Sequence, residues 1–237
     1  MMAGSEKKFK SPVFTKDIIT IVGGYGSGKS EVAVNLSRHL ATDRSRPVTI
    51  VDLDIVNPYF RSREAAARLA EYGVKSIVPQ GGQFYADLPI ILPEIKGSIE
   101  NARGKVILDV GGDDVGARIL SSLAEAFVPG NYELLMVLNA RRPFTSDVDG
   151  TVKVMDEIAR SSRLAFTGIV SNTHLLEDTT VDTVMEGYQL AQAVSRKLNL
   201  PVVFLSALNE IVQKIDTKAI DIPVLTLDRF LLKPWER

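Results

Sequence analysis

Short apolar runs alternate with stretches of helical periodicity along the whole chain. Most of the runs are continuous and rich in Val, Ile and Leu, which is typical of strands buried on both faces of a parallel sheet. The runs predict strands at Ile18–Val22, Val48–Asp52, Ser76–Val78, Val106–Val110, Leu134–Asn139, Phe166–Ser171 and Val202–Ser206. Apolar positions that recur every three or four residues predict helices over residues 30–41, 61–72, 95–102, 117–127, 148–161, 183–198 and 209–215.

This alternation indicates the fold class. Strands and helices that alternate form mostly parallel sheets, with right-handed crossover helices on both faces. We therefore predict a three-layer, doubly wound α/β domain with a mostly parallel sheet of about seven strands. We expect residues 17–237 to form this single domain and residues 1–16 to form a flexible N-terminal tail. The segment Gln80–Pro93 has no clear period and is interpreted as a mobile loop or a partner surface.

Composition narrows the function classes. The chain has 237 residues, 45% of them hydrophobic, which is enough for one sizeable core. Its formal net charge of −1 gives no strong nucleic-acid signal. It has no cysteine, which excludes disulfides, thiolate metal sites and iron–sulfur clusters. No apolar run approaches the roughly 20 residues of a membrane span, and the start lacks a signal-peptide core, so we expect a cytoplasmic protein without membrane association.

The most informative motif is Gly23–Ser30, which reads G-G-Y-G-S-G-K-S. It fits the P-loop pattern of Gly, four residues and Gly-Lys-Ser, and it lies between a predicted strand and a predicted helix. Together with the alternation of strands and helices, it predicts the P-loop NTPase fold. Glycines let backbone N–H groups turn toward phosphates, and the helix N-terminus favours the same anion. Lys29 is expected to reach the β- and γ-phosphates and Ser30 to hold Mg²⁺. The predicted nucleotide-binding residues here are Gly23, Gly24, Gly26, Ser27, Gly28, Lys29, Ser30 and Glu31.

Acidic residues follow two other strands. Asp52 and Asp54 end the second strand, which we expect to neighbour the P-loop strand, and Asp109 ends the fourth. Carboxylates at this edge of a parallel sheet suit an Mg²⁺ site, so Asp52 and Asp109 are predicted metal residues. In Asp109-x-x-Gly112 the glycine N–H is expected to sense the third phosphate.

The sixth strand runs into Asn172-Thr173-His174-Leu175. The Asn172 amide offers both a donor and an acceptor to a purine edge. Guanine-specific P-loop proteins carry Asn-Lys-x-Asp at this place, whereas here Thr173 and Leu175 replace the Lys and the Asp. The sequence therefore favours adenine. His174 is interpreted as a turn or capping residue rather than a catalyst.

Four arginines are candidates for neutralising charge in a transition state. Arg61 and Arg63 directly follow the loop that contains Asp54, and Arg141 and Arg142 follow the fifth strand.

With these motifs in order, residues 17 to about 206 resemble the MinD/ParA-like P-loop ATPases, the CobQ/CobB/MinD/ParA nucleotide-binding group. The marks are Gly23–Ser30, the Asp52-x-Asp54 strand end with Asn57-Pro58, the Asp109-Val-Gly-Gly112 strand end, and Asn172. The resemblance implies ATP and Mg²⁺ as cofactors. It also implies that Asp54 positions or activates the attacking water, that Asp52 lies near Mg²⁺, and that Asn172 contacts adenine. Members of this group dimerise around two ATP molecules and use hydrolysis to switch partners.

The chain departs from this group at one position. The group's P-loop carries a second lysine directly after the first glycine, where it reaches the nucleotide of the other subunit. This chain has Gly24 there. The resemblance therefore does not by itself decide between a monomer and a homodimer.

Two functions remain in competition. The first is a slow Mg-dependent ATPase that acts as a switch under an unknown regulatory protein, with Lys29 and Asp54 as catalytic residues. The second is an ATP-dependent small-molecule kinase or ligase that resembles dethiobiotin synthetase, with an acceptor pocket built by Arg61, Arg63 and Phe84–Pro93. The C-terminal stretch Leu227–Arg237 mixes apolar and basic residues, and we expect it to dock on its own domain rather than on a membrane.

Overall fold

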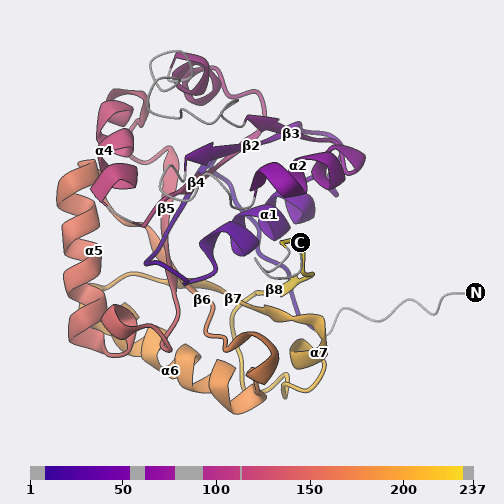
Figure 1. The fold of residues 1–237 in the computed structure, drawn as a ribbon, viewed down its shortest axis with the longest axis vertical. Coiled ribbons are helices and arrows are strands. Elements are labelled where there is room, and N and C mark those ends of the chain that lie inside the picture. The colour runs from indigo at the N-terminus through magenta and orange to yellow at the C-terminus, as the bar shows by residue number, and fades with distance from the viewer. Residues whose placement is uncertain (1–8, 54–61, 78–92, 113, 232–237) are drawn as a thin grey trace, which may run out of the picture.

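The computed structural model describes residues 9–53, 62–77, 93–112 and 114–231. These residues form an eight-stranded sheet in the order β3-β2-β4-β1-β5-β6-β7-β8 (Figure 1). Every strand pair in it is parallel. The strands are β1 Ile18–Val22, β2 Val48–Leu53, β3 Val74–Ile77, β4 Lys105–Val110, β5 Tyr132–Leu138, β6 Gly168–Ser171, β7 Val202–Leu208 and β8 Val224–Leu227.

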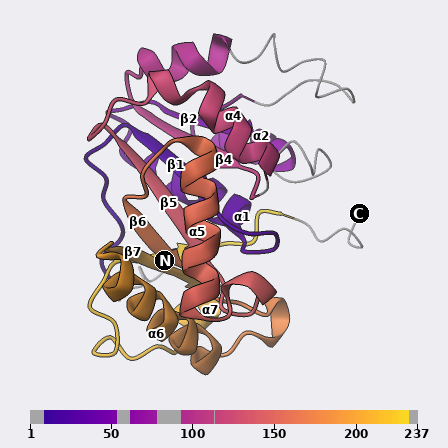
Figure 2. The same ribbon diagram turned by 90° about the vertical axis from the view of Figure 1, so that its left-hand side faces the viewer.

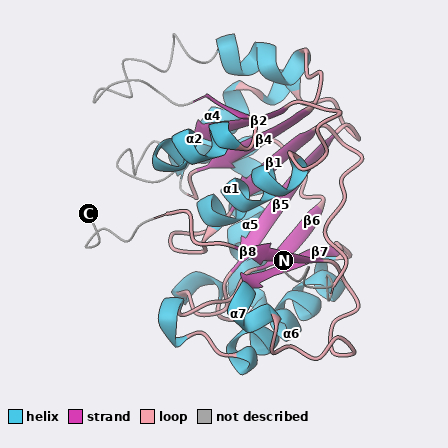
Figure 3. Cartoon of the chain, turned by 90° about the vertical axis from the view of Figure 1, so that its right-hand side faces the viewer, coloured by secondary structure: helices cyan, strands magenta, loops and turns pink. Residues whose placement is uncertain are grey.

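Helices cover both faces of the sheet. They are α1 Lys29–Leu40, α2 Ser62–Glu71, α4 Asp114–Ser122, α5 Val148–Ser162, α6 Val181–Leu198 and α7 Asn209–Val212, and residues 93–100 are also helical. Short 3₁₀ turns, η1 Ala124–Ala126, η2 Pro143–Thr145 and η3 Leu176–Asp178, lie in the connections. Figure 2 shows α5 crossing in front of the strands. Figure 3, from the opposite side, shows α1 and α2 on the other face of the sheet.

The core has two layers because residues of a strand alternate between the two faces. In β1, Ile18 and Val22 join a cluster with α4, α5 and α6, whereas Ile19 and Ile21 join a cluster with α1 and α2. This explains why the strands read as continuous apolar runs rather than alternating ones. The predicted three-layer α/β fold is confirmed.

The structure adds an eighth strand to the expected seven. β8 has only four residues, and its place at the sheet edge comes from tertiary contacts that a sequence pattern does not carry. One such contact joins Tyr188 on α6 to the segment before β8, where the Tyr188 hydroxyl donates to Asp221 Oδ1 at 2.6 Å. Burial, together with this hydrogen bond, raises the pKa of Tyr188 to about 12.

The prediction that the second strand lies next to the P-loop strand is wrong. β1 pairs with β4 and β5, and β2 pairs with β3 and β4, so β4 separates β1 from β2. The strand order depends on how the crossover helices pack, which the chain order alone does not fix.

The described part of the N-terminal segment packs on the domain. Phe14 is 8% exposed and meets Phe204 edge to face, with ring centroids 6.3 Å apart. The buried ammonium of Lys105 donates to the carbonyls of Phe14, at 2.9 Å, and Lys16, at 2.6 Å. Burial acts to raise the pKa of Asp17, but hydrogen bonds from Arg46 and Lys105 lower it below its usual value. In this structure the packed domain therefore begins before residue 17.

The C-terminal segment is tied to α1. The buried Asn35 amide donates to the carbonyl of Asp228 at 2.9 Å and accepts from the N–H of Asp228 at 2.8 Å. Phe230 is 4% exposed, and the guanidinium of Arg68 lies 4.1 Å from its ring centroid. Docking on the protein's own domain is thus observed through Leu231, while residues 232–237 lie outside the described residues.

We expect Asn35→Ala to lower the free energy of unfolding by about 1–3 kcal/mol, because it removes both partners of the Asp228 backbone. Hydrogen exchange of residues 228–231 should speed up as well. Asn101→Ala is the matched control, since Asn101 is exposed and its side chain, among the described residues, bonds only to Gly97 within its own turn. Equal unfolding energies for the two variants would show that the segment is held by other contacts.

Candidate functional site

The loop Gly23–Ser30 connects the end of β1 to the start of α1 at the carboxyl edge of the sheet. It is closed by a hydrogen bond from the N–H of Ser27 to the carbonyl of Gly24 at 3.0 Å. Gly26 and Gly28 have φ values of 71° and 84°, which glycine adopts without steric cost. The loop therefore has the strand, tight turn and helix N-terminus that bind a phosphate group elsewhere.

A buried amide holds the loop from the far side. The Asn172 amide, 3% exposed, donates to the carbonyl of Ser27 at 2.8 Å. Its oxygen accepts from the hydroxyl of Ser206 at 2.9 Å. A methyl group added at Gly28 would lie 2.4 Å from the Asn172 amide nitrogen and 3.0 Å from His174 Nε2. The ends of β6 and β7 thus fix the last turn of the loop.

Arg142 holds the outer turn of the same loop. Its Nε donates to the carbonyl of Gly26 at 2.8 Å. A methyl group at Gly26 would lie 2.9 Å from this nitrogen. In the described structure Arg142 therefore contacts the loop backbone, whereas Arg141 pairs with Glu186.

Gly112 packs directly against the start of the loop. A methyl group at this position would lie 1.9 Å from the carbonyl oxygen of Gly23 and 3.1 Å from the Cα of Gly24. Only a residue without a side chain allows the chain after β4 to approach the loop so closely. By contrast, a methyl group at Gly24 would meet no atom of the described residues within 4 Å.

The predicted metal residues gather at this edge. Asp52 and Asp109 are in register on the paired strands β2 and β4, and they are 7% and 1% exposed. Asp109 is also in register with Ile21 on β1, two positions before the loop. Ser30 and Lys29 are 7% and 8% exposed at the start of α1. Carboxylate and hydroxyl oxygens are the donors that Mg²⁺ prefers, so this set fits the ion.

Among the described residues, no group of three or more His, Asp or Glu side chains could hold a metal ion. An ion here would complete its shell with phosphate oxygens and water, which is usual for Mg²⁺ at phosphate-binding sites.

Other predicted residues lie elsewhere. Glu31 is in the first turn of α1, but its carboxylate accepts from the N–H of Phe230 at 2.7 Å and so faces the C-terminal segment. Asp54, Asn57 and Arg61 lie outside the described residues, as do residues 78–92, and Arg63 lies in α2.

The sequence did not predict two side-chain contacts that hold the loop in place. Ser206 orients Asn172 from the end of β7, and Arg142 bonds to the loop backbone from the turn after β5. A weak signal for Ser206 was present, because it is a polar residue at the carboxyl end of an apolar strand. Nothing in the pattern distinguished Arg142 from Arg141.

Thr173 also has a structural role. It is 2% exposed, and its hydroxyl accepts from the N–H of Ala140 at 3.0 Å. A methyl group at Gly187 on α6 would lie 2.0 Å from this hydroxyl. Leu175 is 42% exposed.

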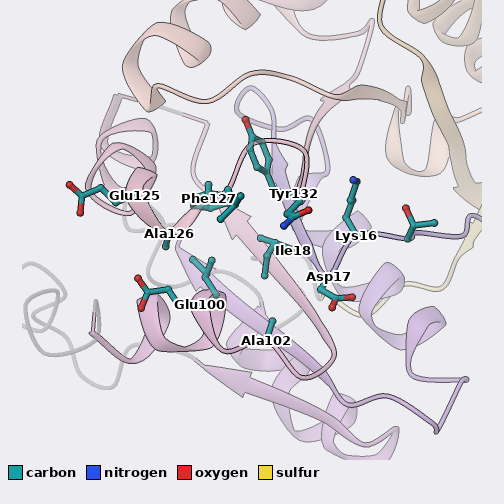
Figure 4. A pocket seen from close by; sticks show the side chains of 13 residues that line it. Lys16, Asp17, Ile18, Glu100, Ala102, Glu125, Ala126, Phe127 and Tyr132 are labelled. Carbon is teal, nitrogen blue, oxygen red and sulfur yellow. The ribbon is translucent and has the colours of Figure 1, made fainter.

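A cavity of about 660 Å³ lies beside the loop, between α4, α5 and the turn after β5. Its walls include Gly24, Tyr25 and Gly112. A second cavity, of about 680 Å³, is lined by Lys16 and Asp17 before β1, by Glu100, and by Phe127 and Tyr132 before and at the start of β5 (Figure 4). These residues lie at the amino ends of the strands, so this second cavity is on the opposite edge from the P-loop.

Solved structures share this fold. Cell division protein FtsY of Thermotoga maritima matches with a TM-score of 0.55 at 20% identity, covering 91% of this chain and 70% of that one. Chloroplast FtsY of Physcomitrella patens matches with a TM-score of 0.54 at 16% identity, covering 90% and 67%. No family model matches the chain, and a search of curated proteins gives no match. The fold is that of the P-loop NTPases, and membership of the MinD/ParA-like group stays a prediction.

No helix within the described ranges is long and apolar enough to cross a membrane.

We expect Gly112→Ala to lower the free energy of unfolding by about 1–3 kcal/mol, because its methyl group would overlap the Gly23 carbonyl. Gly24→Ala makes the same chemical change in open space and should stay within about 0.5 kcal/mol. Urea denaturation of the two variants measures this difference. Equal destabilisation would contradict the close packing of the loop on Gly112.

Proposed function

We propose that the protein binds Mg·ATP at the loop Gly23–Ser30 and hydrolyses it slowly, as a switch controlled by a partner. The observation that carries this proposal is the P-loop fold with two buried carboxylates, Asp52 and Asp109, in register beside the loop. In this arrangement the proposed phosphate and cation sites lie at the same edge of the sheet as the N-terminus of α1. A cytoplasmic location goes with the proposal.

Each residue at this edge has a proposed role. The backbone N–H groups of the loop and the Lys29 ammonium bind the β- and γ-phosphates, and the Ser30 hydroxyl holds Mg²⁺. Asp109 and Asp52 would supply carboxylate oxygens for the ion and its water shell. The bound ion supplies positive charge against the charge that develops on the phosphates. Asp54, which lies outside the described residues, is proposed to position the attacking water.

Gly112 is proposed to report the third phosphate. Gly112 packs against Gly23 and lies two residues before the first residue of α4, so loss of the third phosphate would be passed from the loop toward this helix. Loops that respond to the γ-phosphate are a recurring device of nucleotide switches. This proximity supports a switch, and the partner that would read it is unidentified.

The base is proposed to be adenine. Thr173 and Leu175 stand where a guanine site needs Lys and Asp, and Thr173 is buried against Ala140 and Gly187. Asn172 donates one amide N–H to Ser27, and in the proposed site its second N–H would donate to a purine ring nitrogen. Asn172 would then couple the base to the shape of the loop.

The cavity beside the loop supports a second candidate function. A volume of about 660 Å³ next to Gly24 and Gly112 is large enough for a small-molecule acceptor at the γ-phosphate end of the nucleotide. This supports the ATP-dependent kinase or ligase as the alternative. Product analysis separates the two, since a switch releases only ADP and phosphate, whereas a kinase or ligase also yields a modified acceptor.

We expect Lys29→Ala to weaken ATP binding roughly 10- to 100-fold, because it removes a charged hydrogen bond to phosphate. Isothermal titration calorimetry with Mg·ATP measures the change. Lys214→Ala, at an exposed lysine after α7, is the control and should bind as the wild type does. Unchanged binding by the Lys29 variant, or no binding by the wild type, would refute the proposal. Parallel titration with Mg·GTP tests the choice of adenine.

We expect EDTA to weaken ATP binding by the wild type, and Asp109→Asn to remove most of this metal dependence. The substitution keeps the size of the side chain but removes the charge that holds the ion. Titration of ATP with and without Mg²⁺ measures the dependence in both proteins. Full Mg²⁺ dependence in the Asp109→Asn variant would show that Asp109 is not at the metal.

A further inference from the structure

We propose that the cavity beside the P-loop binds a small organic anion with an apolar body, and that this ligand and the nucleotide change each other's affinity. The binding site is inferred from the cavity alone, whereas the coupling also rests on the proposed nucleotide binding.

One stripe of α5 lines the cavity. Its apolar members are Val154 and Ile158, and its polar members are Lys153, Glu157 and Ser161. Ala117 on α4 faces it as well. Small-molecule sites are typically concave, mostly apolar and roughly 300–1,000 Å³ in volume, and a cavity of about 660 Å³ falls within that range.

Two aromatic side chains stand exposed at the cavity. Tyr25 is 80% exposed and Phe144 is 78% exposed, and both contribute to its walls. Exposed large aromatic side chains that gather at a concavity mark binding sites more often than scattered ones do. An aromatic or branched aliphatic ligand in the cavity would bury part of this exposed aromatic surface.

The charged groups favour an anion. Lys153 and Arg142 line the cavity together with one carboxylate, Glu157, which leaves an excess of positive charge. Lys153 is exposed and makes no ion pair in the part of the chain that the structure describes. Arg142 is fixed by its bond to Gly26 and so presents a guanidinium with a set orientation.

The cavity is separate from the expected base site but shares a wall with the loop. Its lining includes no residue of the β6 and β7 ends, where Asn172 and Ser206 lie. It does include Gly24 and Tyr25 from the loop, and Gly112. A ligand here therefore touches the backbone that would bind the phosphates, which gives the two ligands a direct contact path.

The test uses two fluorescent probes of similar shape. 1-Anilinonaphthalene-8-sulfonate carries a negative charge, and N-phenyl-1-naphthylamine is neutral. Each is titrated into the native full chain, into Lys153→Ala, into Val154→Trp, which fills the cavity, and into the control Lys218→Ala, at an exposed lysine away from the cavity lining. Circular dichroism confirms that each variant is folded before titration.

We expect saturable binding of the anionic probe to the wild type and to the control. Lys153→Ala should weaken the anionic probe roughly two- to fivefold and leave the neutral probe unchanged. Val154→Trp should weaken both probes at least roughly tenfold. Wild-type affinity of folded Val154→Trp for both probes would overturn the proposal, since the probes would then lie elsewhere.

Two further measurements separate the possible failures. Addition of Mg·ATP should shift the affinity of the wild type for the anionic probe, and an unchanged affinity in a protein that binds ATP refutes the coupling. Probe binding in a protein that does not bind ATP leaves the cavity site standing and rejects the proposed function.

Light scattering must show the same oligomeric state for wild type and Val154→Trp. Loss of a dimer in the variant would assign the cavity to a second copy of the chain and overturn the proposal.

Discussion

The rest of the site depends on how the backbone of the P-loop is held in place. A loop that presents N–H groups to an anion exposes its carbonyls on the other side, and buried carbonyls need partners. Asn172 supplies the partner of Ser27, and Arg142 supplies the partner of Gly26. These two side chains come from the turns after β6 and β5, so the loop keeps its shape only when those strands are in place.

Close packing complements these hydrogen bonds. Gly112 touches the backbone of Gly23, and Gly28 touches the side chains of Asn172 and His174. At both positions a glycine is needed because another group occupies the place of a side chain. Gly24 differs, because its surroundings are open. A Cβ could stand there without a clash, so the packing of the described residues does not itself require a glycine at this position.

The sheet order decides what lies next to the loop. β4 lies between β1 and β2, which places Asp109 closer to the loop than Asp52 and puts the two carboxylates in register. The same order places α4 and α5 on one face, where they leave the cavity that opens beside Gly112. On the other face, α1 connects the loop to the C-terminal segment through Glu31 and Asn35. The loop is therefore in contact with both faces of the domain.

The sequence by itself determined the layered fold, the loop Gly23–Ser30 and the position of Asp52 and Asp109 at strand ends. These features are local, because apolar periodicity and turn residues act over a few neighbouring positions. Only the tertiary structure decided the strand order, the eighth strand, the role of Arg142 and the contact of Glu31 with Phe230. Those depend on groups far apart in the chain, such as Asn172 and Ser27, whose pairing is set by how helices pack on the sheet and leaves no periodic signal.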